Sequence, residues 1–199
     1  MNVLLIFVKN PVAGKVKTRL AADIGEQEAL EVYIKLLEIT KEASSSVNAD
    51  RRVWYSAAAE TDDIWSPEKF SKYKQSGKDL GARMSGAFRH AFADGAKKVV
   101  IIGSDCPGIT ANHIEEAYRL LDEADAVLGP SADGGYYLLG MNHFLPALFH
   151  DIDWSTSKVL QQTKAVLNEG GIRYAVLEEM NDIDTAEDLR NDTNLTFEQ

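Results

Sequence analysis

Apolar strand-like runs and amphipathic helical segments alternate along most of this chain, and this alternation restricts the fold more than any other sequence feature. Unbroken apolar runs are typical of strands covered on both faces, and residues 3–8 and 99–102 are runs of this kind. Apolar residues recur at helical spacing in residues 26–43 and 80–92. Strands that alternate with helices predict an α/β fold, a three-layer α/β/α sandwich with a mostly parallel sheet.

The same reasoning places the remaining elements. Further strands are expected at residues 52–58, 126–129, 136–141 and 172–177, and further helices after Thr110, after Ser155 or Thr156, and from Asp184. Residues 9–20 and 60–79 are expected to be irregular, and Gly95 is expected to end a helix. With no repeat, clear linker or low-complexity tract in view, residues 1–199 are expected to form a single domain.

Charge and cysteine content exclude several function classes. Lys and Arg number 21 against 31 Asp and Glu, a net charge of −10, which disfavours general nucleic-acid binding and attachment to an anionic membrane. No apolar stretch approaches ~20 residues, so no membrane span is expected. A single cysteine, Cys106, excludes an intrachain disulfide and agrees with a cytoplasmic location.

The most basic segment follows the first expected strand. In parallel sheets, ligands bind beyond the carboxyl ends of the strands, so this loop is a candidate binding site. It predicts a polyphosphate-binding loop, with a solvated surface loop as the alternative. Its candidate ligand-binding residues are Lys9, Gly14, Lys15, Lys17, Thr18 and Arg19. Neither the P-loop spacing nor the G-x-G-x-x-G pattern fits this segment.

A carboxylate follows the strand at residues 99–102. Mg²⁺ binds one or two protein carboxylates together with substrate phosphates, and Asp105 is placed to hold Mg²⁺ (or Mn²⁺) against a polyphosphate bound by the basic loop. The alternative is that Asp105 caps the turn at Pro107. For the neighbouring Cys106, an inert buried thiol is favoured over a nucleophile.

Three other segments carry weaker signals. Asp133, Gly134, Gly135 and Tyr136 form either an acceptor-binding loop or a simple hairpin turn. Gln75, Asp79 and Arg83 could contact a base or phosphate at a helix start, with plain capping by Asp79 as the alternative. Asp182 or Asp184 could supply a second metal carboxylate, but Asp184 with Glu187 also has the spacing of a capping box.

Six blocks of sequence together resemble an uncharacterised bacterial family of the nucleotide-diphospho-sugar transferase superfamily. Its members are often labelled glycosyltransferases, and some are linked to arsenosugar biosynthesis. The blocks are Phe7-x-Lys9-x-Pro11-x-x-Gly14-x-x-Lys17-Thr18-Arg19-Leu20, Gly77-x-Asp79-Leu80-Gly81-x-Arg83-Met84, Gly103-Ser104-Asp105-Cys106-Pro107, Asp133-Gly134-Gly135-Tyr136, Trp154-Ser155-Thr156 and Asp182-x-Asp184-Thr185-x-Glu187-Asp188-Leu189. The resemblance implies a GT-A Rossmann-like sandwich.

More distantly, the chain is similar to the phospholactate and molybdopterin guanylyltransferases. That similarity implies that Lys17 and Arg19 bind nucleotide phosphates and that Asp105 binds Mg²⁺. Glycosyltransferases of this fold usually carry Asp-x-Asp, whereas residues 104–107 hold one acid. Nucleotidylyltransferases usually have a loop richer in glycine than residues 10–14.

The sequence therefore predicts a Mg²⁺-dependent transferase acting on a nucleotide and a sugar or small phosphorylated acceptor. Nucleotidylyl transfer is favoured because four clustered cations suit a triphosphate. The alternatives are glycosyl transfer with Asp133 as the base, and a non-catalytic nucleotide-binding module. A homodimer is left open, and the base and the acceptor are not specified.

Overall fold

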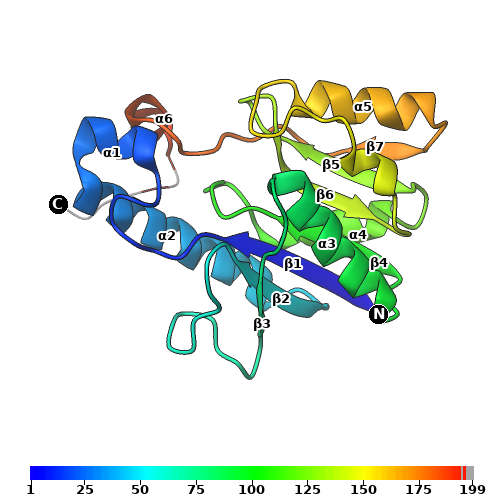
Figure 1. Ribbon diagram of the computed structural model, residues 1–199, viewed down its shortest axis with the longest axis horizontal. Helices are drawn as coiled ribbons and strands as arrows, with labels where there is room; N and C mark the ends of the chain where they lie inside the picture. The colour runs from blue at the N-terminus through cyan, green and yellow to red at the C-terminus, as the bar shows by residue number, and fades with distance from the viewer. Residues whose placement is uncertain (194, 196–199) are drawn as a thin grey trace.

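A computed structural model describes residues 1–193 and 195, which form a seven-stranded sheet in the order β3-β2-β1-β4-β6-β5-β7 with helices packed against it (Figure 1). The strands are β1 (Asn2–Val8), β2 (Asp50–Tyr55), β3 (Ser71–Lys74), β4 (Lys98–Ile102), β5 (Ala126–Pro130), β6 (Tyr136–Met141) and β7 (Tyr174–Val176). The helices are α1 (Thr18–Ile24), α2 (Glu26–Ser45), α3 (Leu80–Ala93), α4 (Ala111–Leu120), α5 (Val159–Glu169), α6 (Ala186–Asn191) and the short 3₁₀ helix η1 (Pro146–Phe149).

The sheet is mostly parallel, as the sequence predicts. β1 pairs in parallel with β2 and β4, β2 with β3, and β5 with β7, whereas β6 runs antiparallel to β4 and β5. In the β1–β4 pair, Ile6 lies opposite Ile102. The two central strands therefore end at one edge, and the loops that follow them start side by side.

Alternate side chains of β1 enter two different apolar cores. Leu4 and Ile6 join a buried cluster with α2 and α4, while Val3 and Leu5 join a second cluster with α3, α5 and η1. The sheet is thus covered on both faces, which confirms the expected three-layer sandwich. No helix among residues 1–193 is both long and apolar enough to cross a membrane.

Two elements occur where an irregular chain was expected. β3 is a four-residue edge strand whose sequence, Ser71–Lys74, contains no apolar run to signal it. The basic segment turns into helix α1 at Thr18, within the expected loop at residues 9–20. α1 has only seven residues and no acidic residue in its first turn, so the usual helix-start signals are missing.

The final helix begins one residue later than the sequence suggested. The capping box is formed by Thr185 and Asp188, not by Asp184 and Glu187. The Asp188 carboxylate accepts from the Thr185 amide at 2.7 Å, and the Thr185 hydroxyl accepts from the Asp188 amide at 3.2 Å. Because Asp184 is not the N-cap residue, its carboxylate is available to other groups.

This shift in the cap has a measurable consequence. Thr185→Ala should lower the free energy of unfolding by about 1 kcal/mol, because α6 then loses its N-cap side chain. Glu187→Ala should leave it unchanged, since Glu187 is exposed and takes no part in the cap. Urea unfolding of both variants tests this assignment. The reverse ranking would restore the cap at Asp184 and Glu187.

Candidate active site

A cleft of about 760 Å³ opens at the carboxyl edge of β1 and β4. Its size is within the range of small-molecule sites, and it lies where ligands bind in α/β sheets. Its polar lining residues include Lys9, Arg19, Gln75, Asp79, Arg83, Ser104, Asp105, Asp133, Asp182 and Asp184. Segments far apart in the sequence therefore contribute charged groups to one cavity.

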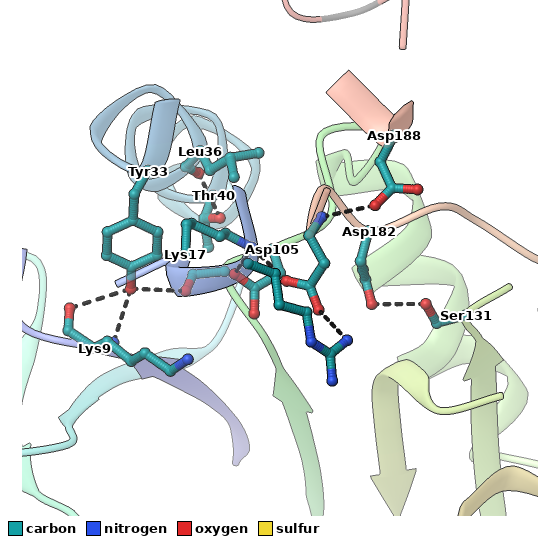
Figure 2. Close-up of polar contacts among 12 residues, drawn as sticks. Lys9, Lys17, Tyr33, Leu36, Thr40, Asp105, Ser131, Asp182 and Asp188 are labelled. Atoms are coloured by element: carbon teal, nitrogen blue, oxygen red, sulfur yellow. Dashed lines mark hydrogen bonds and ion pairs between the residues drawn. The ribbon is translucent and has the colours of Figure 1, made fainter. Parts of the chain in front are cut away.

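Lys17 joins the basic loop to the acidic residues of the cleft (Figure 2). Its side chain is only 3% exposed, and its amine contacts the Asp105 carboxylate and lies 3.2 Å from Asp184 Oδ1. Its backbone is left-handed, with φ 47° and ψ 45°, at the position just before α1. Burial alone lowers the pKa of this amine, but Asp105 and Asp184 more than offset that effect and raise it. Lys17 is therefore a buried ammonium ion at neutral pH.

Residues 182–184 are fastened directly to the loop that carries Asp105. The Ile183 amide donates to the Asp105 carbonyl at 3.0 Å, and the Ile183 side chain is fully buried against α1 and α2. The flanking Asp182 and Asp184 both line the cleft. The sequence analysis offered Asp182 or Asp184 as a second carboxylate, and the structure places both acids at the site.

Asp182 is the more enclosed of these two carboxylates. Ser131 donates a hydrogen bond to it at 2.6 Å, which holds the carboxylate in place beside the β5–β6 turn. Burial, and then the negative charges of Asp105 and Asp133, raise the pKa of Asp182 to about 7 despite that hydrogen bond. Ser131 was not predicted from the sequence, because a lone serine in a turn carries no signal of its own.

The basic loop contributes fewer cations to the cleft than the sequence predicted. Lys9 and Arg19 line it, and Arg19 Nη1 lies 3.8 Å from Asp184 Oδ2. Gly14, Lys15, Lys17 and Thr18 are not among its lining residues, although the Lys17 amine contacts the lining residue Asp105. Ligand binding by these four residues stays a prediction. The chain turns at Gly14, where φ is 71°, and enters α1 at Thr18. The Lys15 side chain between them is exposed.

At the start of α3, structural roles take precedence over the predicted ligand contacts. Asp79 lines the cleft but caps α3, accepting from the Ala82 amide at 2.8 Å, as the alternative reading proposed. The Gln75 amide nitrogen donates to the carbonyls of Trp54 at 2.8 Å and Val8 at 3.3 Å. Arg83 lines the cleft and remains a candidate for contact with an anion.

The glycine-rich segment forms the hairpin turn between β5 and β6. Asp133 accepts from the Gly135 amide at 2.8 Å, and both residues line the cleft. Gly134 is not among the lining residues, and a side chain there would collide with the Ser157 carbonyl, so the turn requires glycine. Its ligand contact stays a prediction. The Tyr136 hydroxyl is fully buried close to Thr163, so it does not reach an acceptor, although the residue lines the cleft.

Cys106 is an unreactive buried thiol, as the sequence favoured. It is 3% exposed and donates to the Met180 sulfur at 3.5 Å. Burial raises its pKa to about 12, so at pH 8 the reactive thiolate is scarce. We expect iodoacetamide to modify native protein about 10³-fold more slowly than urea-unfolded protein at pH 8. Equal rates, followed by mass spectrometry, would contradict this assignment.

The mostly parallel sheet, with its cleft at the carboxyl ends of β1 and β4, has the fold of the nucleotide-diphospho-sugar transferases and nucleotidyltransferases. Within that class, the chain belongs to the bacterial family described as "Uncharacterized protein conserved in bacteria (DUF2064)", whose model matches residues 39–156. The resemblance inferred from the sequence motifs is thus confirmed.

Named relatives agree with this placement. A protein from Desulfovibrio desulfuricans G20, assigned as a nucleotide-diphospho-sugar transferase, is 34% identical, with a TM-score of 0.86 over 94% of this chain and 84% of that one. A 2-phospho-L-lactate guanylyltransferase from Methanocaldococcus vulcanius is 26% identical over 94% of this chain and 82% of its own. A nucleotidyl transferase from Methanothermobacter, 15% identical with a TM-score of 0.62, shares the fold.

Proposed function

We propose that the protein is a Mg²⁺-dependent nucleotidyltransferase that joins a nucleotide to a small phosphorylated acceptor. The observation that carries this proposal is the contact of the buried Lys17 amine with Asp105, a residue that lines the cleft. It brings the phosphate-binding loop and the metal-binding carboxylate to one place. The names of two relatives, both transferases, support the enzyme class.

The acidic side of the cleft fits a divalent cation. One small cation, the Lys17 amine, already contacts both Asp105 and Asp184, so the two carboxylates can serve one ion. Within residues 1–193 and 195, no group of three or more His, Cys, Asp or Glu side chains has metal-binding geometry. Mg²⁺ needs only one or two protein carboxylates when substrate phosphates and water complete its shell. When bound, Mg²⁺ would neutralise phosphate charge and polarise the α-phosphate.

The residues of the chain supply positioning and positive charge to the reaction. In the proposed reaction, an acceptor phosphate oxygen attacks the α-phosphorus of a nucleoside triphosphate, the bond to the β-phosphate oxygen breaks, and pyrophosphate leaves. Lys17 and Arg19 offset the negative charge that develops on the phosphates. Asp133, at the β5–β6 turn, faces the cleft where the acceptor would bind. An ionised phosphate nucleophile needs no general base.

Product analysis tests this reaction. Purified protein with Mg²⁺ should release pyrophosphate from one of the four common nucleoside triphosphates when a panel of sugar phosphates and small phosphorylated hydroxy acids is supplied. GTP with 2-phospho-L-lactate belongs in that panel because of the guanylyltransferase relative. Nucleotide binding without pyrophosphate release across the panel would instead favour a non-catalytic module.

Glycosyl transfer is the second candidate, because the 34% identical relative is assigned as a nucleotide-diphospho-sugar transferase. Asp133 would then activate the acceptor hydroxyl, although its Oδ1 accepts from the Gly135 amide. Under this function the triphosphates would stay intact, and a nucleotide sugar would release a nucleoside diphosphate. Parallel samples with nucleotide sugars in place of the triphosphates, analysed by anion-exchange chromatography, separate the two reactions.

A further inference from the structure

One hydroxyl group lies where the chain leaves both central strands. Tyr33 projects from α2 and is 1% exposed (Figure 2). Its hydroxyl oxygen accepts from the Lys9 amide at 2.8 Å and lies 3.1 Å from both the Lys9 carbonyl and Ser104 Oγ. Lys9 is the first residue after β1, and Ser104 lies two residues beyond the end of β4.

The bonding capacity of this hydroxyl is fully used by these two residues. A phenol offers one hydrogen and two acceptor positions, so it donates to the Lys9 carbonyl and accepts from the Lys9 amide and from the Ser104 hydroxyl. Burial raises the pKa of Tyr33, which keeps that hydrogen in place. Both backbone groups of Lys9 are thereby held by one atom.

The two anchored residues lead directly to the groups that meet in the cleft. Ser104 precedes Asp105, and Lys9 begins the basic loop that ends at Lys17. The Lys17–Asp105 contact therefore depends on how these two loops are placed relative to each other. The Tyr33 hydroxyl contacts both loops, at Lys9 and at Ser104, and Tyr33 is not among the residues that line the cleft.

We propose that Tyr33 is a positioning residue, whose hydroxyl sets the separation between the basic loop and Asp105. This inference rests on the proposed transferase function. The transition state of phosphate transfer is stabilised only when the charged side chains lie at the correct distance from the phosphate. The rate is therefore sensitive to the separation of the two loops, because a misplacement of roughly 1 Å can lower a rate by about 10²-fold. Nucleotide affinity depends on more contacts and should change less.

A second tyrosine provides a matched control. Tyr118, on α4, belongs to the same apolar cluster and is 3% exposed. Its hydroxyl is buried, with no hydrogen-bond partner in the part of the chain that the structure describes. Tyr118→Phe thus removes a buried hydroxyl from the same core without touching either loop. Removing an unpaired buried hydroxyl should be nearly neutral for stability.

The experiment compares Tyr33→Phe, Ser104→Ala, their double variant and Tyr118→Phe. We expect Tyr33→Phe to lower kcat by about 10- to 100-fold and to change KM for the triphosphate by less than about 3-fold. Ser104→Ala should lower kcat in the same direction, and the double variant should be no slower than Tyr33→Phe, because both residues act through one link. Amide hydrogen exchange at Lys9 should accelerate in Tyr33→Phe alone among the tyrosine variants.

A Tyr33→Phe enzyme with wild-type kcat would overturn the inference. So would a Tyr118→Phe enzyme whose kcat falls by the same factor as that of Tyr33→Phe. A wild-type protein with no transfer on the whole panel would defeat the proposed function instead. Amide hydrogen exchange at Lys9 then decides on the link by itself: faster exchange in Tyr33→Phe than in Tyr118→Phe supports it, and equal exchange in the two variants rejects it.

Discussion

Asp105→Asn should lower kcat/KM for the proposed nucleotidyl transfer by about 10²- to 10³-fold, which corresponds to several kcal/mol of transition-state stabilisation. The substitution keeps the size of the side chain and removes its negative charge. It thereby removes the proposed metal ligand and the principal partner of Lys17. The Asp105 side chain is 40% exposed, so the asparagine can be hydrated, but the buried Lys17 ammonium is left with Asp184 alone, and the free energy of unfolding should fall.

A surface pair elsewhere offers a control for this variant. Asp122 contacts the Lys98 amine at 2.6 Å and is 68% exposed, but it does not line the cleft. Asp122→Asn therefore removes one carboxylate from a lysine without affecting the site and should retain wild-type kcat/KM. Steady-state kinetics at several Mg²⁺ concentrations should also show that only Asp105→Asn changes the dependence on Mg²⁺. Full activity in Asp105→Asn would exclude Asp105 as a metal ligand.

Most of the fold could be predicted because its determinants are local. Buried strands such as β1 and β4 are continuous apolar runs, and α3 shows a clear apolar stripe ending at Gly95. The sequence failed where this signal is weak. The strand β3 is short and polar, and α1 begins at a left-handed lysine instead of a conventional capping residue.

The candidate site was predicted only in part, because its assembly depends on contacts between distant segments. The sequence indicated Lys17 and Asp105 separately, as groups that follow two strands. It could not show that the amide of Ile183 would dock on the Asp105 carbonyl and bring a second pair of acids to the cleft. Nor could it place Tyr33, which looks like any other apolar residue of an amphipathic helix.

At three of the predicted ligand-binding residues one physical cause is at work: backbone groups must be satisfied before side chains are available to ligands. Asp79 caps α3, and Asp133 closes its own turn. The side-chain amide of Gln75 donates hydrogen bonds to two strand carbonyls. In contrast, Asp184 became available because Thr185 and Asp188 took over the cap. Local sequence patterns do not decide between neighbouring residues that can cap equally well.

Lys17→Met should lower kcat/KM by about 10²- to 10³-fold with little change in stability. Methionine matches the unbranched shape of lysine and removes its charge. Both residues have similar difficulty in adopting the left-handed backbone seen at this position, so that strain largely cancels in the comparison. The partners Asp105 and Asp184 are 40% and 45% exposed, so water can solvate them once the amine is gone.

Lys15→Met is the matched control, because it removes the same charge from the same loop. Lys15 is exposed, whereas the Lys17 amine is buried against Asp105, so the Lys15 variant should keep wild-type kcat/KM. Equal losses in both variants would mean that the loop acts through its total charge, and salt would then weaken the wild-type enzyme to the same degree. If Lys17→Met loses stability by several kcal/mol in urea, the buried ammonium serves folding. A stable, folded and inactive Lys17→Met protein is the result expected of a lysine whose charge acts on the phosphates of the substrate.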